Sequence, residues 1–180
     1  DKKLERVLKF IEDLKEKVEE MDDIEEKVQK GFIHRDEFAY LFEKTMKAVL
    51  ENYQKEKIEC FKKVLVNSLR FDDVKAEEQE MYINIVNDMP VLHLRVFRLL
   101  VHPRLFNQER GNPIRDDFSG SSGSRLGIIS ALVPEVDKDH LKPIIVDLNN
   151  KGLIQLQNPE TMISRTDIGM LDGLVTEFGN

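Results

Sequence analysis

Apolar residues recur at alternating steps of three and four along the first part of the chain, and charged residues fill the positions between them. This spacing is typical of a helix that packs along one side against another helix. Gly31 ends the pattern, and Asp36 is suited to cap the helix that follows. The apolar positions of the first helix are Leu4, Val7, Ile11, Leu14, Val18, Met21 and Val28.

A second apolar face extends from Phe38 to Leu69. Its spacing predicts one helix of about thirty residues, roughly 50 Å long at 1.5 Å per residue. Two long helices in succession favour an antiparallel hairpin. We therefore expect a coiled-coil-like helical hairpin over residues 1–75.

Two shorter helices are expected in residues 76–103, which would connect the hairpin to the rest of the chain. The first begins near Ala76, and the second covers residues 91–101. It ends at His102 because a residue that precedes proline disfavours helical geometry. Glycine, proline and serine are frequent in residues 104–123, which predicts a flexible loop or linker there.

The C-terminal segment alternates between helical and extended patterns. Pro134 closes its first helix, Asp137 caps its second, and Lys151-Gly152 is a stop signal. Two strands joined by a turn at Asn158-Pro159 would follow, and Thr166 would cap a last helix. The expected elements are helices 124–132 and 137–150, strands 153–156 and 162–165, and helix 167–177.

Two short runs in this segment resemble winged helix-turn-helix proteins. DLNNKGLI places a glycine where a recognition helix must end and turn into a wing strand, and SRTDIG places a hydroxyl cap where the wing returns to a helix. They resemble the "L..L..KGLI" and "T..G" signatures of regulators of the multiple-antibiotic-resistance and related types. The resemblance implies a winged-helix-like domain at residues 124–180, with residues 91–101 as its first helix.

These expectations describe a mainly α-helical protein. A long antiparallel helical hairpin is followed by a winged-helix-like C-terminal domain that carries a small two-stranded β wing.

Charge and cysteine content narrow the functional classes. The net charge is −7, and residues 1–90 hold 17 basic and 23 acidic side chains. An acidic chain is a poor general binder of nucleic acids or anionic membranes. The single cysteine, Cys60, cannot form an internal disulfide, which is typical of a reducing compartment, so we expect a cytoplasmic protein. No apolar run approaches the roughly 20 residues of a membrane span.

Five side chains are the candidate nucleic-acid contacts of the expected winged helix: Lys138, His140, Lys142, Lys151 and Arg165. In DNA-binding members, the second helix of the turn enters the major groove and cations of the wing meet phosphates. Asp137, Asp139 and Asp147 share this helix. A firm binder makes on the order of 6 to 10 phosphate contacts, so DNA binding is the alternative to a protein partner. A dimer would double the cations.

The motifs of metal sites and enzymes are absent from the sequence. The four histidines, His34, His93, His102 and His140, have no close spacing to one another or to the cysteine. The chain lacks a phosphate-binding P-loop, a G-x-S-x-G elbow and a Cys/His arrangement around its thiol. We expect no metal, no cofactor and no enzymatic activity.

The run EKIECFKKVLVNSL, followed after an acidic loop by EMYINIVNDMPVLHLRVFRLLVHP, resembles a group of uncharacterised bacterial proteins. It is also distantly similar to the abortive infection alpha proteins of phage defence. Members of the group often carry a Gly-rich apolar segment ahead of the hairpin. This chain starts at Asp1 in helical register, which we interpret as an N-terminal truncation that removed such a segment. The resemblance implies a bacterial protein and brings no catalytic residues.

The leading functional hypothesis is a non-enzymatic interaction or regulatory protein. The hairpin and the winged helix would dock protein partners or a second copy of the chain in a homodimer. A DNA-binding transcriptional regulator is the main alternative, and a phage-defence component is a further one.

Overall fold

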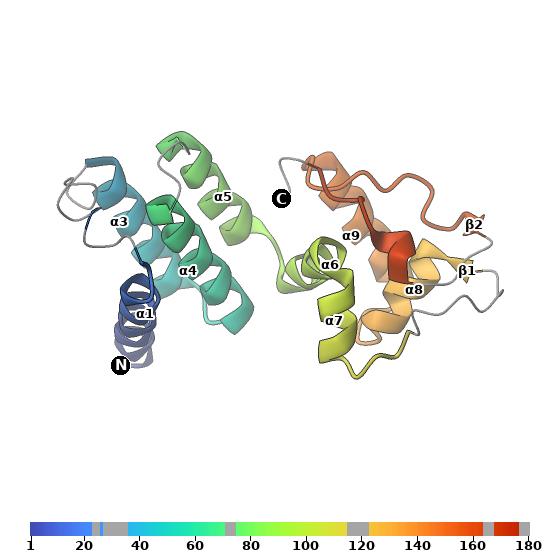
Figure 1. The fold of residues 1–180 in the computed structure, drawn as a ribbon, viewed down its shortest axis with the longest axis horizontal. Coiled ribbons are helices and arrows are strands. Elements are labelled where there is room, and N and C mark those ends of the chain that lie inside the picture. Colours follow the sequence, from blue (N-terminus) through green and yellow to red (C-terminus); the bar gives the residue numbers. More distant parts are fainter. Residues whose placement is uncertain (23–25, 27–35, 71–74, 115–122, 164–167, 177–180) are drawn as a thin grey trace. The chain divides into compact units, whose positions relative to one another are not determined.

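A computed structural model describes residues 1–180 except 23–25, 27–35, 71–74, 115–122, 164–167 and 177–180. The described residues form eight α-helices and two short strands, so the protein is mainly helical, as predicted (Figure 1). The chain divides into two compact units, Asp1–Val91 and Leu92–Asn180. Of the helices in the described part of the chain, none combines the length and the apolar character needed to cross a bilayer.

The N-terminal unit contains four described helices: α1 (Lys2–Glu19), α3 (Asp36–Glu51), α4 (Lys55–Arg70) and α5 (Ala76–Asp88). Helices α3 and α4 pack against each other, and each also packs against α1 and α5. The apolar spacing of these helices supplies one shared core, made of Phe10, Leu14, Leu41, Ala48, Val49, Phe61, Leu65, Val66 and Ile83.

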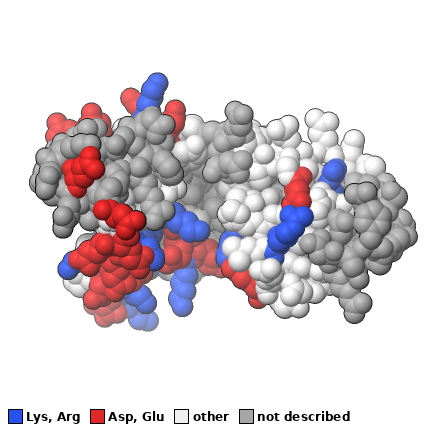
Figure 2. Space-filling view, viewed as in Figure 1, with Lys and Arg blue, Asp and Glu red and all other residues white. Residues whose placement is uncertain are grey.

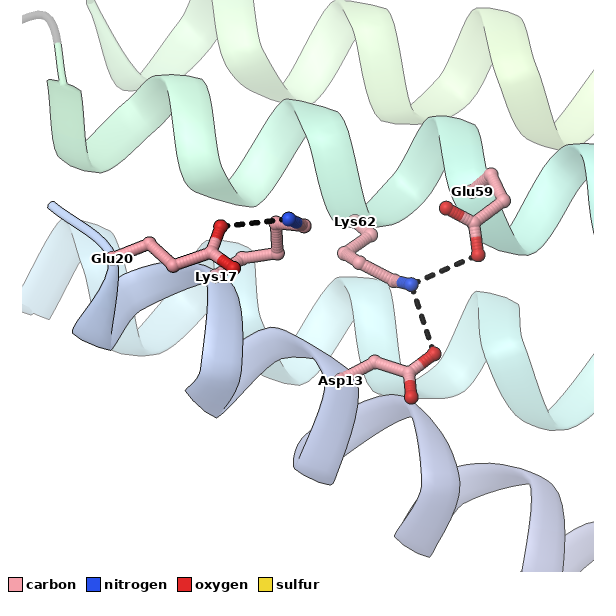
Figure 3. Close-up of polar contacts among 5 residues, drawn as sticks. All are labelled: Asp13, Lys17, Glu20, Glu59 and Lys62. Carbon is pink, nitrogen blue, oxygen red and sulfur yellow. Dashed lines mark hydrogen bonds and ion pairs between the residues drawn. The ribbon is translucent and has the colours of Figure 1, made fainter.

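An ionic cluster adds to the apolar contacts that hold α1 on α4. The Nζ atom of Lys62 donates to Asp13 Oδ2 at 2.9 Å and to Glu59 Oε1 at 2.8 Å (Figure 3). Only 9% of the Lys62 side chain is exposed. Burial lowers the pKa of Lys62, but its hydrogen bonds to Glu59 and Asp13 outweigh burial and raise the pKa. Lys62 is therefore a charged link between two helices.

The prediction of one continuous helix from Phe38 to Leu69 is wrong. Residues 52–54 separate α3 from α4. Hydrogen bonds to the end of α5 hold this turn: Asn52 Nδ2 donates to Asn87 Oδ1 at 2.9 Å, and Lys57 Nζ donates to the Asn87 carbonyl at 2.6 Å. By turning back, the chain buries Phe61 against the same core as Val49. The predicted two-helix hairpin over residues 1–75 is replaced by a unit that includes α5.

The first helix also ends earlier than predicted. Helix α1 begins after Asp1, whose side chain accepts a hydrogen bond from the Lys3 amide at 2.9 Å, and it ends at Glu19. Phe10 and Leu14 are its buried residues. Val28, the last position of the predicted pattern, lies outside the described residues.

The C-terminal unit contains α6 (Val91–Val101) apart from its first residue, α7 (Pro103–Glu109), α8 (Arg125–Leu132) and α9 (Lys138–Asn150). The ranges predicted for α6, α8 and α9 agree with the structure. Helix α7 falls where the sequence predicted the start of a loop at residues 104–123. Pro103 occupies the first turn of α7, where its missing N–H costs no helical hydrogen bond. Residues 115–122 of the predicted loop lie outside the described residues.

The predicted pairing of residues 153–156 with 162–165 is wrong among the described residues. Strand β2 (Met162–Ile163) pairs antiparallel with β1 (Gly123–Ser124) instead. Ile154 forms a bridge with Val175, and the Gln155 amide donates to the Leu174 carbonyl at 2.7 Å. Two separate extended contacts therefore replace the predicted β hairpin.

The predicted last helix at residues 167–177 is reduced to one 3-10 turn, η2 (Ile168–Leu171). Gly173 follows this turn with a φ of +68°, and the chain then extends to pair with residues 153–155. This pairing requires an extended backbone, which excludes a helix over the same residues. Thr166 and Asp167, the predicted start of the helix, lie outside the described residues.

Candidate interaction face on helix α9

Helix α9 begins and ends at the residues that the sequence indicates. The Asp137 side chain accepts a hydrogen bond from the Asp139 amide at 3.1 Å at the N-terminus. At the C-terminus, the Gly152 amide donates to the Asn149 carbonyl at 2.9 Å, and the Leu153 amide donates to the Leu148 carbonyl at 3.1 Å. Gly152 has a φ of +71°, so these bonds form a Schellman motif.

One side of α9 is buried and the other is exposed. Leu141, Ile144, Ile145 and Leu148 are buried, and α9 packs against α8. The exposed side, which we term the α9 face, consists of Lys138, Asp139, His140, Lys142, Pro143 and Val146. Three of the five predicted nucleic-acid contacts, Lys138, His140 and Lys142, are therefore exposed on α9, with Lys138 and Lys142 side by side at one edge of the face and His140 at the other edge.

Carboxylates accompany the lysines on and around α9. Lys142 Nζ lies 2.7 Å from Glu160 Oε1, and this hydrogen bond raises the pKa of Lys142. Lys151, a further predicted contact, lies at the C-cap with its Nζ 3.8 Å from Asp147 Oδ2. The fifth predicted contact, Arg165, lies outside the described residues. Three lysines thus share this region with four carboxylates, since Asp137 and Asp139 occupy the start of the helix.

The position of the acids matters as much as their number. The N-terminus of a helix carries a partial positive charge and free amides that attract phosphate groups. In α9, the side chain of Asp137 already accepts a hydrogen bond from one of these amides, that of Asp139. The side chain of Asp139 adds a second carboxylate in the first turn. These two carboxylates therefore oppose the approach of a DNA phosphate to the N-terminus of α9.

The middle of the α9 face is apolar. Val146 is 56% exposed, and Pro143 is also exposed. Pro143 has no N–H, so the Asp139 carbonyl cannot receive the usual helical hydrogen bond from position i+4. The face thus combines an apolar patch with one carbonyl that lacks its usual helical donor.

A polar contact between α6 and α9 has no signal in the sequence. His93 Nε2 lies 3.5 Å from Asp147 Oδ2, although the two residues are far apart along the chain. Burial lowers the pKa of His93 and outweighs the opposing attraction of Asp147. The Nδ1 atom of His93 is buried and has no hydrogen-bond partner among the residues that the structure describes. His93 is therefore suited to be neutral at pH 7.

A second polar cluster joins α6 and α7 to the turn before α9. Glu135 accepts hydrogen bonds from Arg110 NH2 at 2.7 Å and from Arg95 NH1 at 2.9 Å. Burial opposes the ionisation of Glu135, but the hydrogen bonds from both arginines outweigh it and lower the pKa to about 2. Because Glu135 binds both arginines, this cluster holds the turn in place ahead of α9.

Candidate metal ligands do not cluster in the part of the chain that the structure describes. Within the described ranges, no group of three or more His, Cys, Asp or Glu side chains could hold a metal ion. Cys60 is half-buried within α4, and His34 lies outside the described residues.

No protein-family model, curated protein or solved structure matches this chain.

Proposed function

We propose that this protein is a non-enzymatic interaction or regulatory protein and that its C-terminal unit docks a protein partner through the α9 face. The charge balance around α9 is the observation that carries the proposal. Three lysines there accompany four carboxylates, and Lys142 lies 2.7 Å from Glu160. Neutralisation of phosphates by basic side chains supplies most of the affinity for DNA. A surface with at least as many acidic as basic side chains therefore favours a protein partner over DNA.

The composition of the α9 face gives the docking mode. An exposed Val146 and Pro143 at its centre supply apolar area, and the surrounding charges of both signs supply a polar rim. A partner would bury the apolar centre and pair with the rim. The expected mechanism is surface complementarity without chemistry.

We also propose that the C-terminal unit is a winged-helix-like domain. Support comes from the helix order α6, α8, α9, from the short turn between α8 and α9, and from the Schellman end of α9. Helix α7 and the two-residue strands depart from the expected arrangement.

Site-specific crosslinking tests the docking role. A benzophenone side chain placed at position 146 in the full chain would react with whatever lies on the α9 face in the native host. We expect a discrete adduct that is sensitive to protease and resistant to nuclease. Position 108, which is exposed on α7, is the control and should not yield this adduct. A nuclease-sensitive adduct alone would contradict the proposal.

DNA binding is the second candidate function because Lys138 and His140 are exposed on the first turn of α9. It predicts a salt-dependent mobility shift of labelled duplex DNA. The shift would be lost when Lys138→Glu and Lys142→Glu are combined. Absence of a shift from the wild-type chain at low salt would remove this candidate.

A further inference from the structure

Helix α1 leaves part of its apolar surface exposed. Leu4, Leu8 and Ile11 are 56%, 58% and 41% exposed, although Phe10 and Leu14 on the same helix are buried. Residues at these spacings lie on one side of a helix, so the three side chains form a continuous stripe beside the buried positions. We call Leu4, Leu8 and Ile11 the α1 stripe.

Carboxylates follow one edge of the α1 stripe. Glu5, Glu12 and Glu16 are exposed and recur at helical spacing, one position after Leu4, Ile11 and Lys15, and the exposed Lys9 lies between Glu5 and Glu12 on the same line. We call these three glutamates the acidic row. Lys15 continues the line of the stripe, and its Nζ lies 3.6 Å from Glu19 Oε1. Three carboxylates against the single Lys9 give the row a net negative charge. Figure 2 shows acidic side chains gathered over α1 in this view.

The charges beside the α1 stripe distinguish between two possible partners: a second copy of α1 and a basic helix of another protein. In a two-fold antiparallel pairing of α1 with a second copy, each edge of the helix meets the same edge of its partner. Glu5 of one copy would then approach Glu12 of the other, and repulsion would oppose the pairing. A partner with lysines or arginines beside its apolar residues would instead place positive charges along the acidic row.

We propose that the α1 stripe and the acidic row bind a basic amphipathic helix of another protein. The inference goes beyond the docking function proposed above, because it concerns a different unit of the chain. The partner helix would present apolar residues at i, i+4 and i+7, flanked by Lys or Arg. Apolar contacts would hold it on the stripe, and the acidic row would fix its orientation.

Fluorescence anisotropy of the full chain tests this inference with two labelled peptides. One carries a leucine stripe at i, i+4 and i+7 flanked by lysines, and the other carries glutamates in place of the lysines. We expect the basic peptide to bind more tightly than the acidic one. Leu8→Ser should weaken its binding by roughly tenfold, as should the pair Glu5→Lys with Glu12→Lys.

Matched variants separate docking from general charge and folding effects. The pair Glu51→Lys with Glu78→Lys changes the net charge equally at exposed positions of α3 and α5 and should leave binding nearly unchanged. Tyr53→Ser removes another exposed apolar side chain, 75% exposed, with the same expected result. Far-UV circular dichroism of each variant would verify that its helices are intact.

Three outcomes would overturn the inference: equal binding of both peptides, equal losses in the matched variants, or no binding of the basic peptide at millimolar protein. Self-association in sedimentation that Leu8→Ser abolishes would assign the stripe to a second copy instead.

A Val146→Asp variant should keep peptide binding. Loss of docking at α9 alone would therefore leave this inference standing, and loss of peptide binding alone would leave the α9 proposal standing.

Discussion

The substitution Lys62→Met should destabilise the N-terminal unit, because it removes the ammonium that links α1 to α4. The Nζ atom of Lys62 lies 2.9 Å from Asp13 and 2.8 Å from Glu59, and its side chain is 9% exposed. Methionine keeps the apolar stem of the lysine. Asp13 and Glu59, whose side chains are 33% and 58% exposed, can regain water after the substitution.

The expected size of the effect follows from the two contacts. The Glu59 contact joins residues three apart on one helix, and the Glu59 side chain is 58% exposed, so the contact contributes about 0.3–0.5 kcal/mol. The Asp13 contact joins two helices and is better shielded, so about 1 kcal/mol is expected. Because methionine avoids the cost of burying an ammonium, the net loss for Lys62→Met should be about 1 kcal/mol. In a double-mutant cycle with Asp13→Asn, the coupling should also be about 1 kcal/mol.

Tyrosine fluorescence during urea unfolding measures this effect in the full chain. The chain has no tryptophan, and its three tyrosines, Tyr40, Tyr53 and Tyr82, all lie in the N-terminal unit. The exposed pair Lys47–Glu43 supplies a control, since Lys47→Met should leave the unfolding midpoint nearly unchanged. A coupling near zero between Lys62→Met and Asp13→Asn would refute the reasoning, because the two side chains would then not interact.

Three further predictions concern the C-terminal unit, and far-UV circular dichroism in urea checks each of them. Burial lowers the pKa of His93, so the unfolded chain binds a proton that the folded chain does not, and stability should fall as the pH drops below about 6.5. His93→Gln should reduce this loss, and an unchanged pH dependence would refute the burial argument. The pKa of Glu135 is about 2, so its contribution should be complete above its unfolded pKa and lost as the pH falls from about 4.3 toward 2. Glu135→Gln should flatten the stability curve over that interval, and a parallel curve would show that its arginine contacts are not formed. Gly152→Ala should cost about 1 kcal/mol because φ is +71° there, whereas Gly127→Ala, inside α8, should be neutral or stabilising. Equal effects at the two glycines would contradict the Schellman ending of α9.

The sequence predicted α8 and α9 well because their ends depend on local signals. Ser124 and Asp137 accept hydrogen bonds from amides within three residues, and Gly152 supplies the left-handed backbone that ends α9. Such contacts can be recognised in a short window of sequence. The same reasoning fails for α7, because the composition of residues 104–123 predicts a loop, whereas Pro103 is favourable in the first turn of a helix.

The break between α3 and α4 could not be predicted in the same way. The apolar pattern continues through Tyr53, so periodicity alone favours one helix. The turn depends on Asn52 and Lys57, whose side chains bond to Asn87 on a different helix. The exchange of strand partners near the C-terminus has a similar origin, since Ile154 bridges to the distant Val175.

The candidate site was predicted in part. Lys138, His140 and Lys142 are all exposed, and the i, i+4 spacing places Lys138 beside Lys142. The sequence also showed that acids accompany them. It did not show the contact of Lys142 with Glu160, because the contact spans the end of α9 and the following segment. The contact of His93 with Asp147 joins two helices and was missed for the same reason.

The affinity of the full chain for duplex DNA at low salt, about 50 mM, tests the proposed role of the α9 face most directly. The account predicts no salt-dependent binding by the wild-type chain. It predicts that Asp139→Lys combined with Glu160→Lys creates such binding, because five cations would then accompany two carboxylates around α9. Binding by the wild-type chain that is lost on Lys138→Glu with Lys142→Glu would contradict the account and assign the face to DNA.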